Sequence, residues 1–125
     1  NAIDYVVAER HFIKNTFKAD HFAEPKIETQ AAFDKLFGVA AVMGENGMPT
    51  KIDFAKQYVI AATEKESYIE TQLVPTSLTK EGENVVLKYT IKRGAKTTAI
   101  TKPLLMIVVD KSVTGKVIVE GSEVK

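Results

Sequence analysis

The sequence predicts an α+β domain: a curled antiparallel β-sheet or small barrel of about seven strands, with one short helix packed against it. Three observations lead to this fold class. Apolar residues alternate with polar ones in several segments after Ala62, one earlier segment has helical spacing, and polar turn sequences separate segments of hairpin length. The length of 125 residues suits one domain, so we expect residues 1–125 to form a single unit.

The N-terminal segment Asp4–Ile13 predicts the first strand. Val6, Ala8 and Phe12 fall on one side of its alternating pattern. The residues that follow are polar and contain Pro25, which is typical of a connection.

A change of period after Thr29 predicts the helix. Phe33, Leu36 and Phe37 lie three and four residues apart, which places them on one helical face. Thr29 is a suitable N-cap, and Gly38 is suited to end the helix in a left-handed conformation.

The remaining strands follow from the period-two segments and the turns between them. They are expected near residues 57–63, 68–78, 85–92, 97–101, 104–110 and 116–121. The clearest is "NVVLKYTIK", in which Lys88 and Lys92 fall on the solvent side. The sequences "KEGEN", "KRGAK" and "KSVTGK" are turn signals, so we expect an antiparallel meander.

Composition and charge exclude several classes of function. Seventeen basic and sixteen acidic side chains leave a net charge of +1, so no global field attracts nucleic acid or an anionic membrane. The chain has no cysteine, which excludes disulfides, thiolate nucleophiles and sulfur-ligated metals. Its longest apolar run, "PLLMIVV", has the length of a core strand and is too short for a transmembrane segment.

Residue types that often act in catalysis are present, but they do not have the spacing of a catalytic or metal-binding motif. His11 and His21 lack the spacing of a metal pair, and no serine lies in a Gly-x-Ser-x-Gly elbow. The paired glutamates fall in polar turns beside lysine, where solvated charge is the better interpretation; they are Glu64 with Glu66 and Glu81 with Glu83. We therefore expect no catalytic residue, no metal, no cofactor and no enzymatic activity.

The segment from residue 38 to residue 53 is predicted to be a long loop, and loops of this length in compact domains usually have a function. Its Asn46 and Gly47 favour a tight turn that brings Met43 and Met48 together. Either the two methionines pack on the sheet or, with Asn46 and Gly47, they bind a partner. Asp53, just before a strand, is expected to accept bonds from backbone N–H groups.

Four segments carry a resemblance to a known family: "FDKLFG", "PTKIDFAKQYVIA", "EGENVVLKYTI" and "PLLMIVVDKSVTGKVIV". In their order and pattern they resemble the C-terminal domain of PrcB, the accessory subunit of a bacterial surface protease complex, and its secreted relatives. The resemblance covers about residues 27–120. In "TEKESY", Tyr68 matches a turn of that family, while the glycine that precedes the tyrosine there is missing here.

The resemblance implies a non-catalytic, exported binding module, at the cell surface or in the periplasm, that stabilises a protease or assists it. Its partner is then a protein, and Tyr68 joins the loop residues as a candidate contact. The start at Asn1 fits export and leaves room for a lipid anchor upstream of it. Two alternatives stay open: a protease inhibitor that acts through its loops, and a small-ligand carrier or enzyme with a cavity at the mouth of a barrel.

Overall fold

The computed structural model describes residues 2–8, 11–14, 22, 24–39 and 52–123, and these residues form nine strands and one helix. In chain order the elements are β1 (Val6–Val7), β2 (His11–Ile13), β3 (Lys26–Ile27), α1 (Gln30–Leu36), β4 (Phe37–Val39), β5 (Gln57–Thr63), β6 (Ser67–Glu81), β7 (Asn84–Thr101), β8 (Leu104–Asp110) and β9 (Lys116–Glu123).

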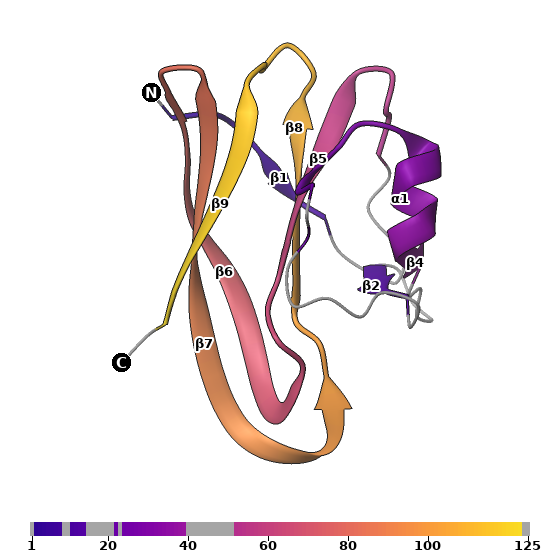
Figure 1. The fold of residues 1–125 in the computed structure, drawn as a ribbon, viewed down its shortest axis with the longest axis vertical. Coiled ribbons are helices and arrows are strands. Elements are labelled where there is room, and N and C mark those ends of the chain that lie inside the picture. Colours follow the sequence, from indigo (N-terminus) through magenta and orange to yellow (C-terminus); the bar gives the residue numbers. More distant parts are fainter. Residues whose placement is uncertain (1, 9–10, 15–21, 23, 40–51, 124–125) are drawn as a thin grey trace.

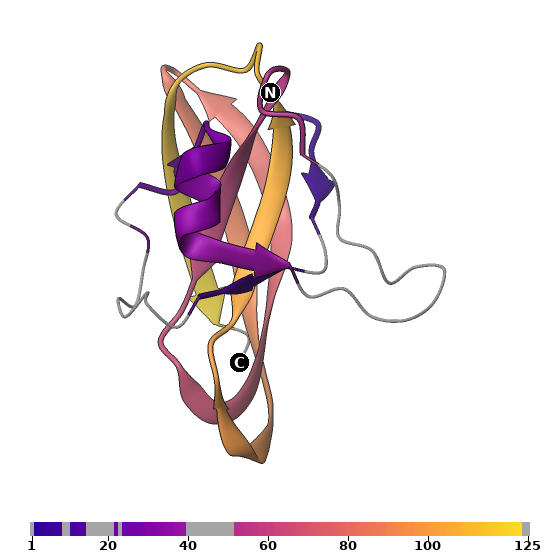
Figure 2. The same ribbon diagram turned by 90° about the vertical axis from the view of Figure 1, so that its right-hand side faces the viewer.

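The long strands form two facing sheets. One sheet has the order β1-β8-β5-β3, the other has the order β6-β7-β9, and β2 pairs separately with β4. Figures 1 and 2 show the helix α1 on the outer side of the four-stranded sheet, away from β6, β7 and β9. The described residues therefore form three layers.

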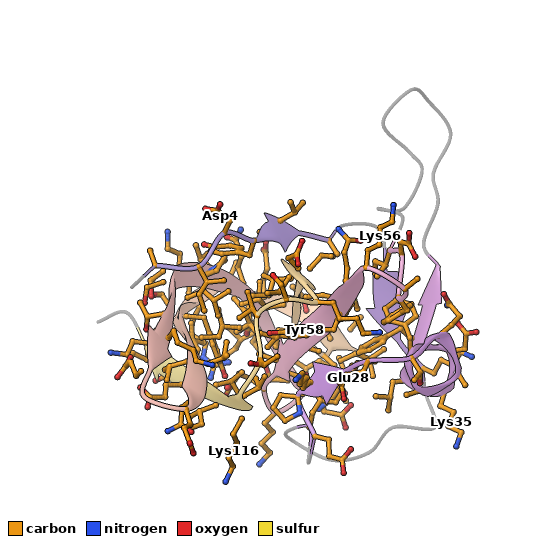
Figure 3. The ribbon with its side chains drawn as sticks, turned by 90° about the horizontal axis from the view of Figure 1, so that it is seen from above. Asp4, Glu28, Lys35, Lys56, Tyr58 and Lys116 are labelled. Atoms are coloured by element: carbon orange, nitrogen blue, oxygen red, sulfur yellow. The ribbon has the colours of Figure 1, made fainter. Side chains whose placement is uncertain are left out.

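The central strands β5 and β8 are buried on both faces, because each face meets a different layer. Tyr58 and Ile60 of β5 belong to the hydrophobic cluster between the two sheets. Val59, which lies between them in sequence, belongs to a second cluster with Phe33 of α1. Figure 3 shows Tyr58 in the interior, whereas Lys35 of α1 lies at the periphery. The continuous apolar runs of these two strands follow from this double burial.

Several local predictions are confirmed. The strands β5 and β8 have the expected bounds, and Gly82 occupies the turn between β6 and β7 with a φ of 63°. Thr29 caps α1, since its Oγ1 accepts a hydrogen bond of 3.2 Å from Ala32 N. Asp53 Oδ1 accepts from Ala55 N at 3.0 Å, in the turn that precedes β5.

The predicted end of the helix at Gly38 is wrong. The helix ends at Leu36, and Phe37 is already extended, with φ −125° and ψ 148°. Gly38 lies within β4, paired with Phe12 of β2. Strand pairing with β2 satisfies the backbone here, so a left-handed glycine is not needed.

The single strand predicted over residues 4–13 is also wrong. β1 pairs with β8, whereas β2 pairs with β4, so the two pieces belong to different sheets. Ala2, before β1, forms an isolated bridge with Thr79 of β6. The N-terminal segment thus passes from one long sheet to the other, which alternation in the sequence does not reveal.

The predicted turn at "KRGAK" does not form. β7 runs without interruption through these residues to Thr101, and β6 remains its partner down to Ser67. Irregular register accommodates the extra residues of β7: Ile69 pairs with Lys96, whereas Ser67 pairs with Thr101. A β-bulge absorbs additional residues without ending a strand.

The last strand overturns the expected antiparallel meander. The "KSVTGK" segment crosses from β8 to the other sheet, where β9 pairs with β7 in parallel. The remaining pairings among the described strands are antiparallel. The two sheets are not closed into a barrel, and the mostly β architecture with one short helix is what the described residues show.

Candidate functional site

The part of the β6–β7 ribbon that extends past the described part of β9 has a distinctive surface. We call this part the arm; it comprises residues 67–72 of β6 and 92–101 of β7. The described part of β9 accompanies β7 as far as the pair Ile91–Glu123, and Figure 1 shows β6 and β7 continuing below this part of β9. Every residue of the arm is exposed or half-buried.

Three large apolar side chains are exposed on the arm. Tyr68 is 49% exposed, Ile69 is 41% exposed and Ile100 is 50% exposed. All three lie in the part of the ribbon where the register between β6 and β7 is irregular. Single exposed apolar residues are ordinary, but three on one ribbon form a candidate contact surface.

Hydroxyl groups hold the backbone of the arm in place. Ile69 N donates to Ser67 Oγ at 3.2 Å, and Thr71 Oγ1 donates to Ile69 O at 2.9 Å. From the opposite strand, Thr97 Oγ1 donates to Tyr68 O at 2.9 Å. These local bonds fix the positions from which Tyr68 and Ile69 project.

Arg93 joins all three strands at the root of the arm. Its Nη1 donates to Thr71 Oγ1 of β6 at 3.0 Å. Its Nε and Nη2 donate to Glu123 Oε1 of β9, at 3.0 Å and 2.7 Å. The planar guanidinium suits such a multiple contact, so Arg93 connects the arm to the end of β9.

The crossing points between the sheets also anchor the arm. Tyr89 of β7 is buried, and its hydroxyl donates to the Glu64 carboxylate. Burial and this hydrogen bond raise the pKa of Tyr89 above its usual value. Lys102 Nζ donates to Glu64 O at 3.2 Å, and Thr63 Oγ1 donates to Pro103 O at 2.6 Å.

A second polar feature lies between the sheets at Tyr58. Its side chain is buried, and its hydroxyl has no hydrogen-bond partner among the described residues. Burial raises its pKa, and the negative charge of Glu28 adds to that effect. Lys26 Nζ lies 4.8 Å from the centre of the Tyr58 ring, which is a cation–π contact.

Two surface grooves are relevant to the ligand-carrier alternative. One, of about 450 Å³, lies between α1 and the segment before it, with Phe22, Ile27 and Leu36 in its lining. The other, of about 320 Å³, lies between β6 and the β1–β8 pair. Within the described ranges, no three His, Asp or Glu side chains lie close enough together to hold a metal ion.

One of the five predicted contact residues lies among the described residues. Tyr68 is exposed on the arm. Met43, Asn46, Gly47 and Met48 lie outside the described residues.

The sequence analysis does not single out Ile69 and Ile100, which lie in two of the predicted strands. The sequence does indicate that these strands are exposed, because "SYIETQ" and "KRGAKTTA" place polar or small residues on both alternating faces of the strand. Such a pattern indicates a ribbon with two solvent-exposed faces.

Comparison with known proteins gave no match: no family model, no curated protein and no solved structure matches the chain. The resemblance to the PrcB C-terminal domain therefore stays a prediction from the sequence. In the part of the chain that the structure describes, no helix is long and apolar enough to cross a membrane.

Proposed function

We propose that the protein is a non-catalytic binding module that holds a partner protein against the exposed end of its arm. The observation that carries this proposal is the exposure of Tyr68, Ile69 and Ile100 on a ribbon that no other described layer covers. Tyrosine is enriched in protein interfaces, because its large ring contributes contact area while its hydroxyl stays solvated.

Rigidity supports this use of the arm. The hydroxyls of Ser67, Thr71 and Thr97 bind the backbone next to the apolar side chains. A surface that is ordered before binding loses less conformational entropy when the partner arrives. An exported accessory role beside a protease, as the sequence resemblance implies, is one setting for such a module.

Site-specific photo-crosslinking tests the proposal. A photoreactive amino acid is introduced at Tyr68, and a matched control carries it at Glu81, an exposed residue at the other end of β6. In cells that naturally express the protein, we expect a protein adduct from position 68 and none from position 81. Equal adducts from both positions, or none from position 68, would contradict the proposal.

A surface variant provides the second measurement. Tyr68→Ser with Ile69→Thr and Ile100→Thr keeps polar or β-branched residues in the strands. It should change the free energy of unfolding by no more than about 1 kcal/mol, because the sites are exposed. The partner identified by crosslinking should nevertheless bind this variant with a Kd at least tenfold higher, which corresponds to about 1.4 kcal/mol of lost contact energy.

The inhibitor alternative predicts a different use of the arm. A protease cleft binds an extended segment whose backbone is free to pair, whereas the backbone of β6 in the arm already pairs with β7. Assays against a panel of endopeptidases separate the two functions, since a stabilising module leaves the activity of the protease intact.

A further inference from the structure

The arm carries an excess of positive charge. Lys92, Arg93 and Lys96 lie on its β7 strand, and all three are exposed. Glu70 is the single acidic residue of the arm, so three cations against one carboxylate leave it with two net positive charges. The whole chain has a net charge of only +1. The excess on the arm is therefore a local feature that the overall charge does not reveal.

Two of the three cations have no carboxylate of their own. Arg93 is already matched, because its Nε and Nη2 donate to Glu123 Oε1 at 3.0 Å and 2.7 Å. The side chain of Glu70 lies against Gly94: a Cβ built on Gly94 would be 3.6 Å from Glu70 Oε2. Among the described residues, neither Lys92 nor Lys96 forms an ion pair. The charges of these two lysines are therefore available to a partner.

The strand register places these charges beside the exposed apolar side chains. Ile69 is the cross-strand partner of Lys96. Residues paired directly across two antiparallel strands have neighbouring side chains on one face. Thr97, which follows Lys96, donates to Tyr68 O at 2.9 Å, so Tyr68 lies beside the same stretch of β7. The surface of the arm thus combines cationic and apolar groups within a few residues.

Charge complementarity selects among the possible occupants of this surface. Two copies of this chain that met arm to arm would bring the same cations together, which disfavours a second copy. Segments that bind anionic lipid typically cluster about four to eight Lys or Arg side chains. The arm instead offers two unpaired lysines beside three exposed apolar side chains. A protein segment with carboxylates among apolar side chains matches this composition.

We propose that the arm binds a segment of the partner protein in which apolar side chains alternate with carboxylates. The apolar side chains of that segment pack on Tyr68, Ile69 and Ile100, and its carboxylates lie beside Lys92 and Lys96. Apolar contacts supply most of the affinity, whereas the charges supply selectivity and a faster association rate. The inference rests on the proposed function and names the chemistry of the partner.

A binding experiment with the intact chain separates the two contributions. It uses three blocked synthetic peptides: the acidic apolar peptide Glu-Leu-Glu-Phe-Glu-Leu-Glu, the basic peptide Lys-Leu-Lys-Phe-Lys-Leu-Lys and the polar peptide Glu-Ser-Glu-Ser-Glu-Ser-Glu. NMR titration measures each Kd, and the methyl signals of Ile69 and Ile100 locate the bound peptide. We expect the acidic apolar peptide to bind at the arm, and each of the other two to have a Kd at least tenfold higher.

Charge variants test the two lysines directly. Lys92→Glu with Lys96→Glu should raise the Kd of the acidic apolar peptide about tenfold, because each reversal replaces an exposed attraction by a repulsion. Lys92→Arg with Lys96→Arg keeps the charge and should keep the affinity. The matched control is Lys35→Glu with Lys116→Glu, which makes the same change of net charge at exposed lysines of α1 and β9 and should leave the Kd unchanged.

Several results would overturn the inference. They include equal affinity for the acidic apolar and basic peptides, equal affinity for the two acidic peptides, and an equal loss of affinity in the matched control. Vesicles of phosphatidylcholine and phosphatidylserine provide the membrane comparison. Binding to them that Lys92→Glu with Lys96→Glu abolishes, without any peptide binding, overturns the inference in favour of a membrane surface. A dimer in ultracentrifugation that shifts the same methyl signals overturns it in favour of a second copy.

The two proposals fail separately. A protein adduct at position 68 together with no binding of the acidic apolar peptide removes the inference and retains the proposed function. Binding of this peptide to the arm without any adduct at position 68 contradicts the proposed function and retains the chemical preference of the arm.

Discussion

The ring of Tyr89 is buried in the core, while its hydroxyl meets a carboxylate. The hydroxyl donates to Glu64 at the crossing from β5 to β6. Burial and Glu64 together raise the pKa of Tyr89. In the folded protein the hydroxyl therefore keeps its proton at a pH at which an unfolded tyrosine, with a pKa of 10.0, loses it.

The sign of the pH effect follows from this difference. Above pH 10 the unfolded chain binds fewer protons than the folded chain, so the free energy of unfolding falls as the pH rises. We expect Tyr89→Phe to be less stable than wild type by about 1–3 kcal/mol at pH 7, because the hydrogen bond from the Tyr89 hydroxyl to the Glu64 carboxylate is lost. The difference in the free energy of unfolding between wild type and Tyr89→Phe should narrow above pH 10.

Denaturant unfolding at a series of pH values measures this gap, with the exposed Tyr68→Phe as the control that should follow wild type throughout. A gap between Tyr89→Phe and wild type that stays constant up to pH 11 would show that the hydroxyl titrates normally.

Val108 and Val6 offer a matched pair, since they are cross-strand partners with opposite environments. Val108 is 4% exposed and belongs to the cluster beneath α1, whereas Val6 is 59% exposed. Val108→Asp should unfold the domain, because an unpaired charge there costs several kcal/mol. Val6→Asp should change the free energy of unfolding by less than about 1 kcal/mol.

Circular dichroism and the unfolding midpoint compare the two variants. A folded Val108→Asp protein with native spectra would mean that β8 lies open to solvent on the helix side.

At the scale of elements, the contact between β7 and β9 depends on a glycine. A Cβ built on Gly121 would lie 2.6 Å from the Tyr89 ring, far inside van der Waals contact. The parallel pairing places these two residues directly opposite each other. The absence of a side chain at position 121 is what allows the strand to lie over the tyrosine.

We therefore expect Gly121→Ala to destabilise the protein by about 1–3 kcal/mol, the usual cost of overpacking. The control is Gly94→Ala in the arm, whose new Cβ would meet Glu70 at an ordinary 3.5 Å. Thermal unfolding of the two variants should show a lower Tm for the first alone. Equal Tm values would indicate that β9 shifts away from Tyr89 without cost.

At the scale of the whole molecule, β5 and β8 couple the three layers. One face of each strand packs against the β6–β7–β9 sheet, and the other packs against α1 and its neighbours. No layer keeps its apolar surface buried without these two strands. We therefore expect the described residues to unfold in one cooperative transition.

Two truncations on opposite sides of β5 and β8 test this coupling. Leu87→Ala lies in the cluster between the sheets, and Phe33→Ala lies in the cluster beneath the helix. They should cost about 2–5 and 3–5 kcal/mol, respectively, and each should lower a single midpoint seen by every spectroscopic probe. A separate early transition in Phe33→Ala would mean that the helix layer unfolds independently.

The sequence by itself determined the elements whose causes are local. The apolar runs of β5 and β8 predicted strands with the bounds observed, Thr29 marked the start of α1, and "KEGEN" marked the hairpin between β6 and β7. Periodicity, capping and tight turns act within a few residues of the chain, so they can be read directly from it.

The tertiary structure alone decided which segments pair. The division of residues 4–13 between two sheets, the continuation of β7 through "KRGAK", the parallel pairing of β9 and the strand conformation of Gly38 each depend on a hydrogen-bonding partner distant in sequence. Backbone N–H and C=O groups are identical along the chain, so only the arrangement of strands in space determines which of them remain unpaired.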